Sequence, residues 1–177
     1  MTGKNVKALL IIDMLNDFVV KGAPLEVPGA KGIIGNIRRQ INKARRNDIP
    51  IIYCCDSHLK DDREFEVWPP HAVRGSRGAE VVDELKPRPE DIVVYTKTYS
   101  SFYRTTLDKT LKRLGVRHVI LTGVATNICI LYTAVDAYMR GYEVSVPEDC
   151  VAAFRAEDHR FALRQINKLL KPYRSFP

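Results

Sequence analysis

Five side chains with catalytic or metal-binding chemistry follow apolar runs of this sequence, at positions where buried strands would end. They are, in chain order, Asp13, Asp56, His58, Lys97 and Cys129. Carboxylates, an imidazole, an amine and a thiol are the groups that nucleophilic and acid–base catalysis use. Because parallel strands end at the same edge of a sheet, where ligands bind, we expect these side chains to gather at one rim.

Cys129 lies in the stretch Gly-Val-Ala-Thr-Asn-Ile-Cys, where a predicted strand turns into a predicted helix. Thr126 or Asn127 can cap that helix, which places Cys129 in or near its first turn. The positive end of the helix dipole would lower the pKa of the thiol there and favour the reactive thiolate. Lys97 would add a cation nearby, and Asp13 could accept the thiol proton and later pass it to a leaving group. Considered alone, Cys129 also fits an ordinary buried thiol.

A second group of residues has the composition of a metal site. Asp56 and His58 are two positions apart at a strand end, so their side chains lie on the same face. Glu64 and His71 follow in the next stretch, and Asp62 is a rival ligand to Glu64. Two imidazoles with one or two carboxylates suit zinc, iron or manganese. The alternative is a polar loop whose acids and histidines are merely solvated.

The other cysteines and histidines do not form a further motif. Cys54, Cys55 and Cys150 make no C-x-x-C pair, and we expect each to be a buried thiol. A different class of protein remains open at this stage, a catalytically silent binding or redox-responsive protein that uses Cys54 and Cys55. His118 starts a predicted strand at the far edge from the site and is expected to be structural. His159 lies within the last predicted helix and is expected to be a surface residue.

Apolar runs alternate with stretches of helical spacing along the chain, as expected of an α/β protein. Five runs are typical of strands buried on both faces. These runs are Ala8–Ile12, Ile49–Cys55, Ile92–Thr96, Val119–Thr122 and Val144–Val146. Helices are predicted from Ile33 to Ala44, Leu107 to Gly115, Ile128 to Met139 and Glu157 to Leu170. The alternation predicts one domain over residues 1–177, a three-layer α/β fold with an open, mostly parallel β-sheet and helices on both faces.

The formal charge of +7 comes from 28 Lys and Arg against 21 Asp and Glu in 177 residues. The basic residues cluster in segments 38–46 and 155–174, which also carry apolar residues at helical spacing. They are therefore predicted to cover solvated helix faces rather than a nucleic-acid site. The sequence has no apolar run of ~20 residues and no secretory signal pattern. We expect a cytoplasmic protein that binds neither nucleic acid nor a membrane.

The chain resembles the nicotinamidase/pyrazinamidase branch of the isochorismatase-like cysteine hydrolases over nearly its whole length. The resemblance rests on the motifs Ile-Ile-Asp13-Met-Leu-Asn-Asp-Phe18, Asp56-Ser-His58, Trp68-Pro-Pro-His71, Lys97-Thr-Tyr99-Ser-Ser-Phe102 and Gly123-Val-Ala-Thr-Asn-Ile-Cys129. It implies the Rossmann-like topology of that family. It also implies a catalytic triad formed by Asp13, Lys97 and Cys129.

The resemblance further implies how the nucleophile's surroundings are built. An unusual cis peptide is expected just before Ala125, and the backbone N–H groups of Ala125 and Cys129 would form the oxyanion hole. The residues that match positions enclosing the substrate's aromatic ring are Phe18, Trp68 and Tyr99. The matching metal ligands are Asp56, His58 and His71, with Glu64 as the best fourth candidate. The cofactor would be a divalent metal, with zinc as the first expectation and iron or manganese as alternatives.

The function that the resemblance implies is hydrolysis of nicotinamide to nicotinate and ammonia through a cysteine thioester, a step of NAD salvage. The alternative is an isochorismatase-like cysteine hydrolase that acts on another small amide or on an enol ether. The partner would be a small nicotinamide-like substrate. The chain would also assemble as a homo-oligomer, a dimer or a tetramer.

Overall fold

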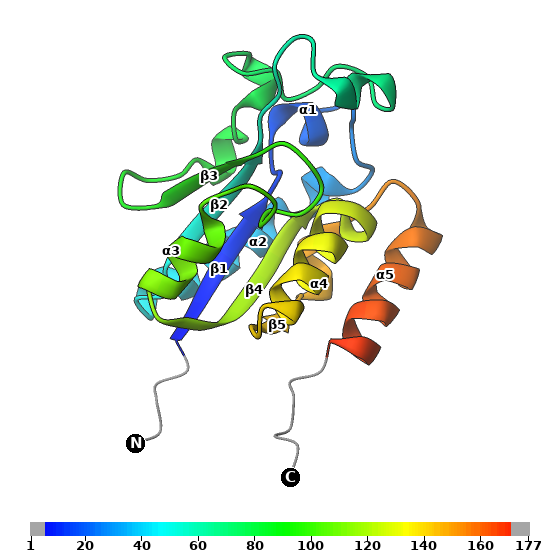
Figure 1. Cartoon of the computed structure of the whole chain (residues 1–177). Helices are drawn as coiled ribbons and strands as arrows, with labels where there is room; N and C mark the ends of the chain where they lie inside the picture. Colours follow the sequence, from blue (N-terminus) through cyan, green and yellow to red (C-terminus); the bar gives the residue numbers. More distant parts are fainter. Residues whose placement is uncertain (1–5, 171–177) are drawn as a thin grey trace, which may run out of the picture.

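The structure is a computed structural model in which residues 6–170 are described. Its centre is a parallel sheet in which β3, β2, β1, β4 and β5 lie side by side in that order, and β6 pairs with β4 beyond them (Figure 1). The bounds are β1 Val6–Ile12, β2 Ile51–Asp56, β3 Ile92–Thr96, β4 Val116–Val124, β5 Glu143–Ser145 and β6 Val151–Ala152. The predicted parallel α/β sheet is confirmed.

Helices cover both faces of this sheet, as the alternation of elements predicts. The bounds are α1 Asn16–Val19, α2 Ala30–Arg46, α3 Leu107–Arg113, α4 Leu131–Met139 and α5 Ala156–Leu169. The strand β1 shows why two cores form. Leu9 and Ile11 pack with the buried face of α2, whereas Leu10 and Ile12 pack with residues of α3, α4 and α5. A fully apolar strand therefore contributes alternate side chains to two layers.

The segment between β2 and β3 is long and holds three short 3₁₀ turns, Arg63–Glu66, Arg77–Ala79 and Asp83–Leu85. It lies over the carboxyl ends of the strands, near α1 (Figure 1). Two isolated bridges fix it, an antiparallel one between Leu15 and Val81 and a parallel one between His58 and Val73. This segment carries several of the predicted site residues, so its attachment to the strand ends determines where they lie.

Some predicted elements differ from those observed. The second strand begins at Ile51 rather than Ile49 and extends to Asp56, and β4 covers nine residues rather than the four predicted. The helix predicted from Ile128 is preceded by a π-helical turn, Thr126–Ile130, and α4 begins only at Leu131. The short elements α1 and β6 were not predicted, because four and two residues are too few to show a periodicity.

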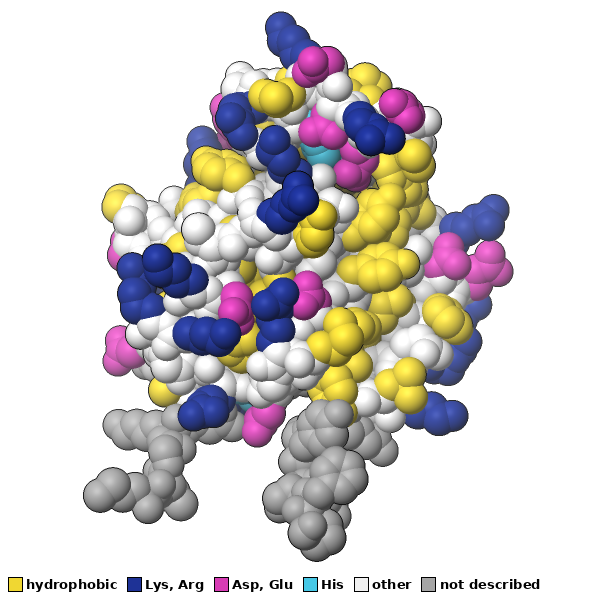
Figure 2. All heavy atoms as spheres, viewed as in Figure 1, with side chains coloured by type: hydrophobic (Ala, Val, Ile, Leu, Met, Phe, Trp, Pro, Cys, Tyr) yellow, Lys and Arg dark blue, Asp and Glu magenta, His cyan; other side chains and the backbone are white. Residues whose placement is uncertain are grey.

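The visible face of the molecule carries charges of both signs. Figure 2 shows Lys and Arg side chains scattered over the visible face and interspersed with Asp and Glu. A band of hydrophobic side chains also crosses this face, and two exposed residues of α4 are Tyr132 and Met139. None of the helices within residues 6–170 is long and apolar enough to cross a membrane. All four cysteines are free thiols.

Candidate active site

Cys129 lies in the π-helical turn that connects β4 with α4. The preceding peptide, between Val124 and Ala125, is cis, as the resemblance implies. Gly123 has a φ of +114°, and a Cβ at this position would lie 1.9 Å from the carbonyl oxygen of Ile12. Only glycine therefore lets the end of β4 pass so close to β1. The turn is held at the rim where β1 ends.

Asp13 is the first residue after β1, and its side chain is 4% exposed. Its backbone is left-handed, with a φ of 52°. Its N–H donates to the carbonyl oxygen of Cys54 at 2.9 Å, and its carboxyl Oδ1 accepts from the N–H of Asp56 at 2.9 Å. A side-chain hydrogen bond joins the carboxyl of Asp13 to the thiol of Cys129. The predicted pairing of Asp13 with Cys129 is therefore present in the structure.

The electrostatics of this pair differ from the sequence-based expectation. Burial, followed by the neighbouring Asp56 carboxylate, raises the pKa of Asp13 to about 8. Burial, followed by the charges of Asp13 and Asp56, also raises the pKa of the Cys129 thiol well above its usual value, against a hydrogen bond from the backbone of Ala125 that lowers it. Burial and the two carboxylates thus outweigh the lowering of the thiol pKa that was expected from a helix dipole. The pair holds a proton that Asp13 can exchange with the sulfur.

Lys97 is not brought to Cys129. Successive residues of a strand face opposite sides, and the side chain of Thr96 is 2% exposed while Tyr95 and Lys97 are exposed. Lys97 lines a different cavity, together with Arg74. Among the described residues, no hydrogen bond or ion pair joins Lys97 to Asp13 or Cys129. A hydrogen bond from the N–H of Glu64, followed by His58 and then by the charge of Lys97, lowers the pKa of the half-buried Asp62. The expectation that Lys97 lies close to the Cys129 thiol is therefore corrected, because strand alternation directs its side chain to the other side.

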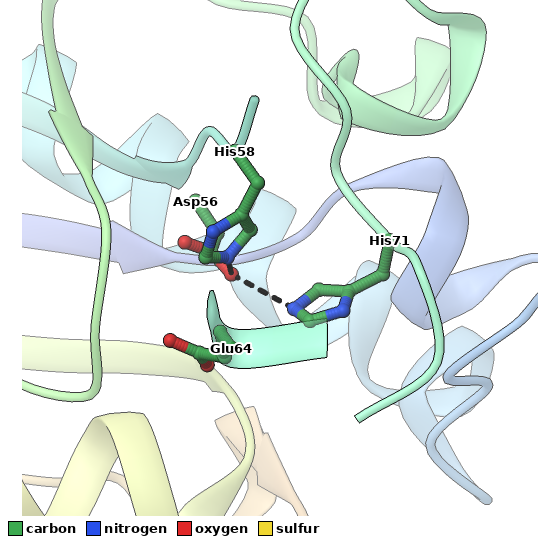
Figure 3. Close-up of side chains that lie close together, drawn as sticks. All are labelled: Asp56, His58, Glu64 and His71. Atoms are coloured by element: carbon green, nitrogen blue, oxygen red, sulfur yellow. Dashed lines mark hydrogen bonds and ion pairs between the residues drawn. The ribbon is translucent and has the colours of Figure 1, made fainter. Parts of the chain in front are cut away.

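Four side chains form a compact polar cluster (Figure 3). They are Asp56, His58, Glu64 and His71, and one possible ligand atom from each lies within 4.8 Å of the others. The Nε2 atoms of His58 and His71 lie 2.8 Å and 3.2 Å from Asp56 Oδ2. The structure thus brings together the predicted set of two imidazoles and two carboxylates.

Neighbouring groups orient the two imidazoles of this cluster. Nδ1 of His71 bonds to the carbonyl oxygen of Pro69 at 2.7 Å, which leaves Nε2 facing the other ligands. Nδ1 of His58 lies 3.2 Å from Asp62 Oδ2, and the other oxygen of Asp62 accepts from the N–H of Glu64. Such outer partners fix the ring orientation and basicity of metal-ligating histidines. Asp62 is therefore placed behind His58, while Glu64 belongs to the inner set.

The cluster fits a divalent cation on chemical grounds. Burial, followed by the charge of Asp56, raises the pKa of Glu64. Burial alone would lower the pKa of His58, but hydrogen bonding and attraction to Asp56 raise it to about 9. Two carboxylates that face each other at a sheltered position need a compensating positive charge. A mixed set of nitrogen and oxygen donors suits zinc, iron or manganese.

The cluster and Cys129 share one cavity, which is partly open to solvent. Its polar lining consists of Asp56, Glu64, His71 and Cys129. The aromatic lining contains the three residues that the resemblance implies, Phe18, Trp68 and Tyr99. The indole Nε1 of Trp68 donates to Tyr99 Oη at 3.2 Å, which fixes the two rings relative to each other.

Sequence reasoning missed part of the cavity wall. Phe154 also lines the cavity and stacks on Trp68, with 6.0 Å between ring centroids and 18° between planes. Leu25, Val124 and Ile128 contribute further apolar surface. Phe154 follows β6 closely, so the rule that ligands bind beyond strand ends would have identified it had this two-residue strand been predicted.

Two expectations about the surroundings of Cys129 are also corrected. Neither Thr126 nor Asn127 caps the helical turn through its side chain. Thr126 Oγ1 instead lies 2.9 Å from Nδ1 of His159, which is half-buried rather than a surface residue. His118 is part of the strand β4 and contacts Ser145 Oγ at 2.7 Å, away from the site, as expected of a structural histidine.

Comparison with known proteins gives the class to which this fold and site belong. Residues 7–174 match the isochorismatase domain, and the chain belongs to that family of hydrolases. N-carbamoylsarcosine amidase from Thermoplasma acidophilum is 37% identical, with a TM-score of 0.84 over 91% of this chain and 92% of that one. Nicotinamidase PncA from Bacillus subtilis is 30% identical, with a TM-score of 0.89 over 94% and 97% of the two chains. Pyrazinamidase from Pyrococcus horikoshii, in complex with zinc, is 32% identical, with a TM-score of 0.86 over 91% and 94%.

Proposed function

We propose that this protein is a metal-assisted amidase that hydrolyses nicotinamide to nicotinate and ammonia. The observation that carries the proposal is the shared cavity, in which Asp56, Glu64 and His71 face the same space as Cys129. A metal-ligand set beside a nucleophile suits a substrate with a ring nitrogen on one side and a carboxamide on the other. The similarity to a nicotinamidase and to a zinc-containing pyrazinamidase supports this choice.

The metal would be held by Asp56, His58, Glu64 and His71, with zinc as the first expectation and iron or manganese as alternatives. When bound, the ion supplies a Lewis acid that can take the pyridine nitrogen as a ligand. The chain's own aromatic residues complete the orientation of the ring. Phe18, Trp68, Tyr99 and Phe154 offer flat apolar surfaces to a flat substrate.

The reaction then depends on Cys129 and Asp13. The sulfur attacks the carboxamide carbon while Asp13 takes the thiol proton, and the carbonyl oxygen becomes an oxyanion. The N–H groups of Ala125 and Cys129 would stabilise that oxygen, each worth about 3 kcal/mol. Asp13 protonates the departing nitrogen, the C–N bond breaks, and ammonia leaves a thioester. Asp13 next accepts a proton from water as its oxygen attacks the thioester carbon. The C–S bond then breaks, nicotinic acid leaves and ionises to nicotinate, and Asp13 returns its proton to the sulfur of Cys129.

Ammonia release from nicotinamide tests the proposal. Purified protein is supplied with zinc, iron or manganese in turn, and Cys129→Ala is measured beside Cys150→Ala, which removes a buried thiol from another part of the fold. We expect activity with at least one metal, a loss of more than a hundredfold in Cys129→Ala and near-normal activity in Cys150→Ala. Absence of release above the Cys129→Ala background with all three metals would refute the assignment.

The second candidate is a cysteine hydrolase of the same family that acts on another small amide or on an enol ether. The similarity to N-carbamoylsarcosine amidase favours it. Assays with N-carbamoylsarcosine and isochorismate, before and after removal of metals with a chelator, separate the two candidates. Turnover of either compound that survives chelation and needs Cys129 would favour this second candidate over nicotinamide hydrolysis.

A further inference from the structure

We propose that His159 is a positioning residue, which holds the turn carrying the nucleophile through a hydrogen bond to Thr126. The inference rests on the proposed function insofar as that turn supplies Cys129 and the backbone donors. Thr126 lies between these donors, directly after Ala125 and three residues before Cys129. Its side chain is completely buried, and its Oγ1 lies 2.9 Å from Nδ1 of His159. A buried hydroxyl that loses its hydrogen-bond partner destabilises the fold, so buried hydroxyls are almost always hydrogen-bonded.

The remaining contacts of the turn show what this hydrogen bond adds. The carbonyl oxygen of Ala125 accepts from the N–H groups of Ile128 and Ile130, at 3.0 Å and 3.1 Å. These bonds lie within the turn and do not join it to a separate element. No side-chain cap holds the start of this turn. The hydrogen bond between Thr126 and His159 links the turn to a separate element, α5.

The helix α5 is a rigid support for this contact. Leu163 and Ile166 are buried in the core that α5 shares with α3, α4 and the sheet. The N–H of His159 is bonded to the carbonyl oxygen of Arg155 at 3.0 Å, so the histidine lies in the first turn of a well-anchored helix. His159 therefore fixes the turn Thr126–Ile130 in place relative to α5.

The sulfur of Cys129 depends on the position of this turn. A hydrogen bond from the backbone of Ala125 favours the thiolate of Cys129. Release of Thr126 would let the Ala125 amide move away from the sulfur and from the site of the oxyanion. Both the reactivity of the thiol and the stabilisation of the tetrahedral intermediate would then fall. The aromatic residues of the cavity, Phe18, Trp68 and Tyr99, lie outside this turn and would keep their positions.

The test compares three substitutions of His159 with a neighbouring control. His159→Asn places a polar atom where Nδ1 lies, His159→Gln places it farther out, at the position of Nε2, and His159→Ala removes it. Arg160→Ala is the control, because Arg160 is exposed on the same helix. The rate of Cys129 alkylation by iodoacetamide at about pH 7.5 is followed by mass spectrometry. For each variant, kcat and KM for nicotinamide and the thermal unfolding midpoint are measured as well.

We expect alkylation to slow by about fivefold and kcat to fall by about tenfold in His159→Ala and His159→Gln, with KM changed less than twofold. His159→Asn should restore most of both rates, and Arg160→Ala should equal the unaltered protein. An unchanged alkylation rate in His159→Ala would overturn the inference. It would also be overturned if the alkylation rate and kcat fell only in proportion to the unfolding midpoint and were not restored in His159→Asn. Alkylation needs no substrate, so failure of nicotinamide hydrolysis would refute the proposed function and leave this test decisive.

Discussion

Replacement of Lys97 by methionine tests the placement of catalytic groups most directly. Methionine keeps the length and apolar character of the side chain and removes its charge. A lysine in contact with the Asp13–Cys129 pair, about 4 Å away in a medium with an effective dielectric constant of ~20, would contribute about 4 kcal/mol. Its loss would slow turnover about a thousandfold. Lys97 is instead exposed and acts on Asp62 through its charge, without an ion pair between them among the described residues. Its contribution should therefore be no more than that of a solvated ion pair, about 0.2–1 kcal/mol.

We therefore expect Lys97→Met to change the rate of nicotinamide hydrolysis by less than about fivefold. In the same assay, Asp13→Asn should lower kcat by about 10²–10⁴-fold, because it removes the group that exchanges the thiol proton. Iodoacetamide labelling of Cys129 gives a second comparison that needs no substrate. A loss of a hundredfold or more in Lys97→Met, with an unchanged unfolding midpoint, would show that Lys97 reaches the catalytic pair and would refute the reasoning from strand alternation.

Three further outcomes follow from contacts in the structure. Asp62→Asn should weaken metal binding about 10–100-fold in competition with a chelator, because it removes the outer carboxylate of the cluster, whereas Asp61→Asn should match the unaltered protein. Tyr53→Phe should lower the free energy of unfolding in urea by about 1–3 kcal/mol, because the carbonyl oxygen of Leu85 loses a buried hydrogen bond of 2.8 Å; an unchanged midpoint would contradict this. Gly123→Ala should lower that free energy by about 3 kcal/mol or more, and retention of full stability would show that the strand ends can separate.

Much of the fold follows from the local pattern of the chain. The runs around Leu10, Ile52 and Leu121 are apolar on both faces, and such strands must be buried between two layers of helices. The strand-end rule then places Asp13 and Asp56 at one rim without further information. Short elements could not be predicted in this way. The strand that precedes Phe154 has two residues and shows no period, and its place in the sheet depends on pairing with a distant strand.

The sequence by itself determined the parallel α/β fold and the set of groups that converge at its rim, because both depend on residue type and on the order of elements. Only the tertiary structure decided which groups meet. Strand alternation faces Lys97 outward, and a loop contact places Asp62 behind His58. The burial of Thr126 against His159 joins residues 33 positions apart. Such outcomes depend on the direction of side chains and on contacts between distant segments, which local spacing does not encode.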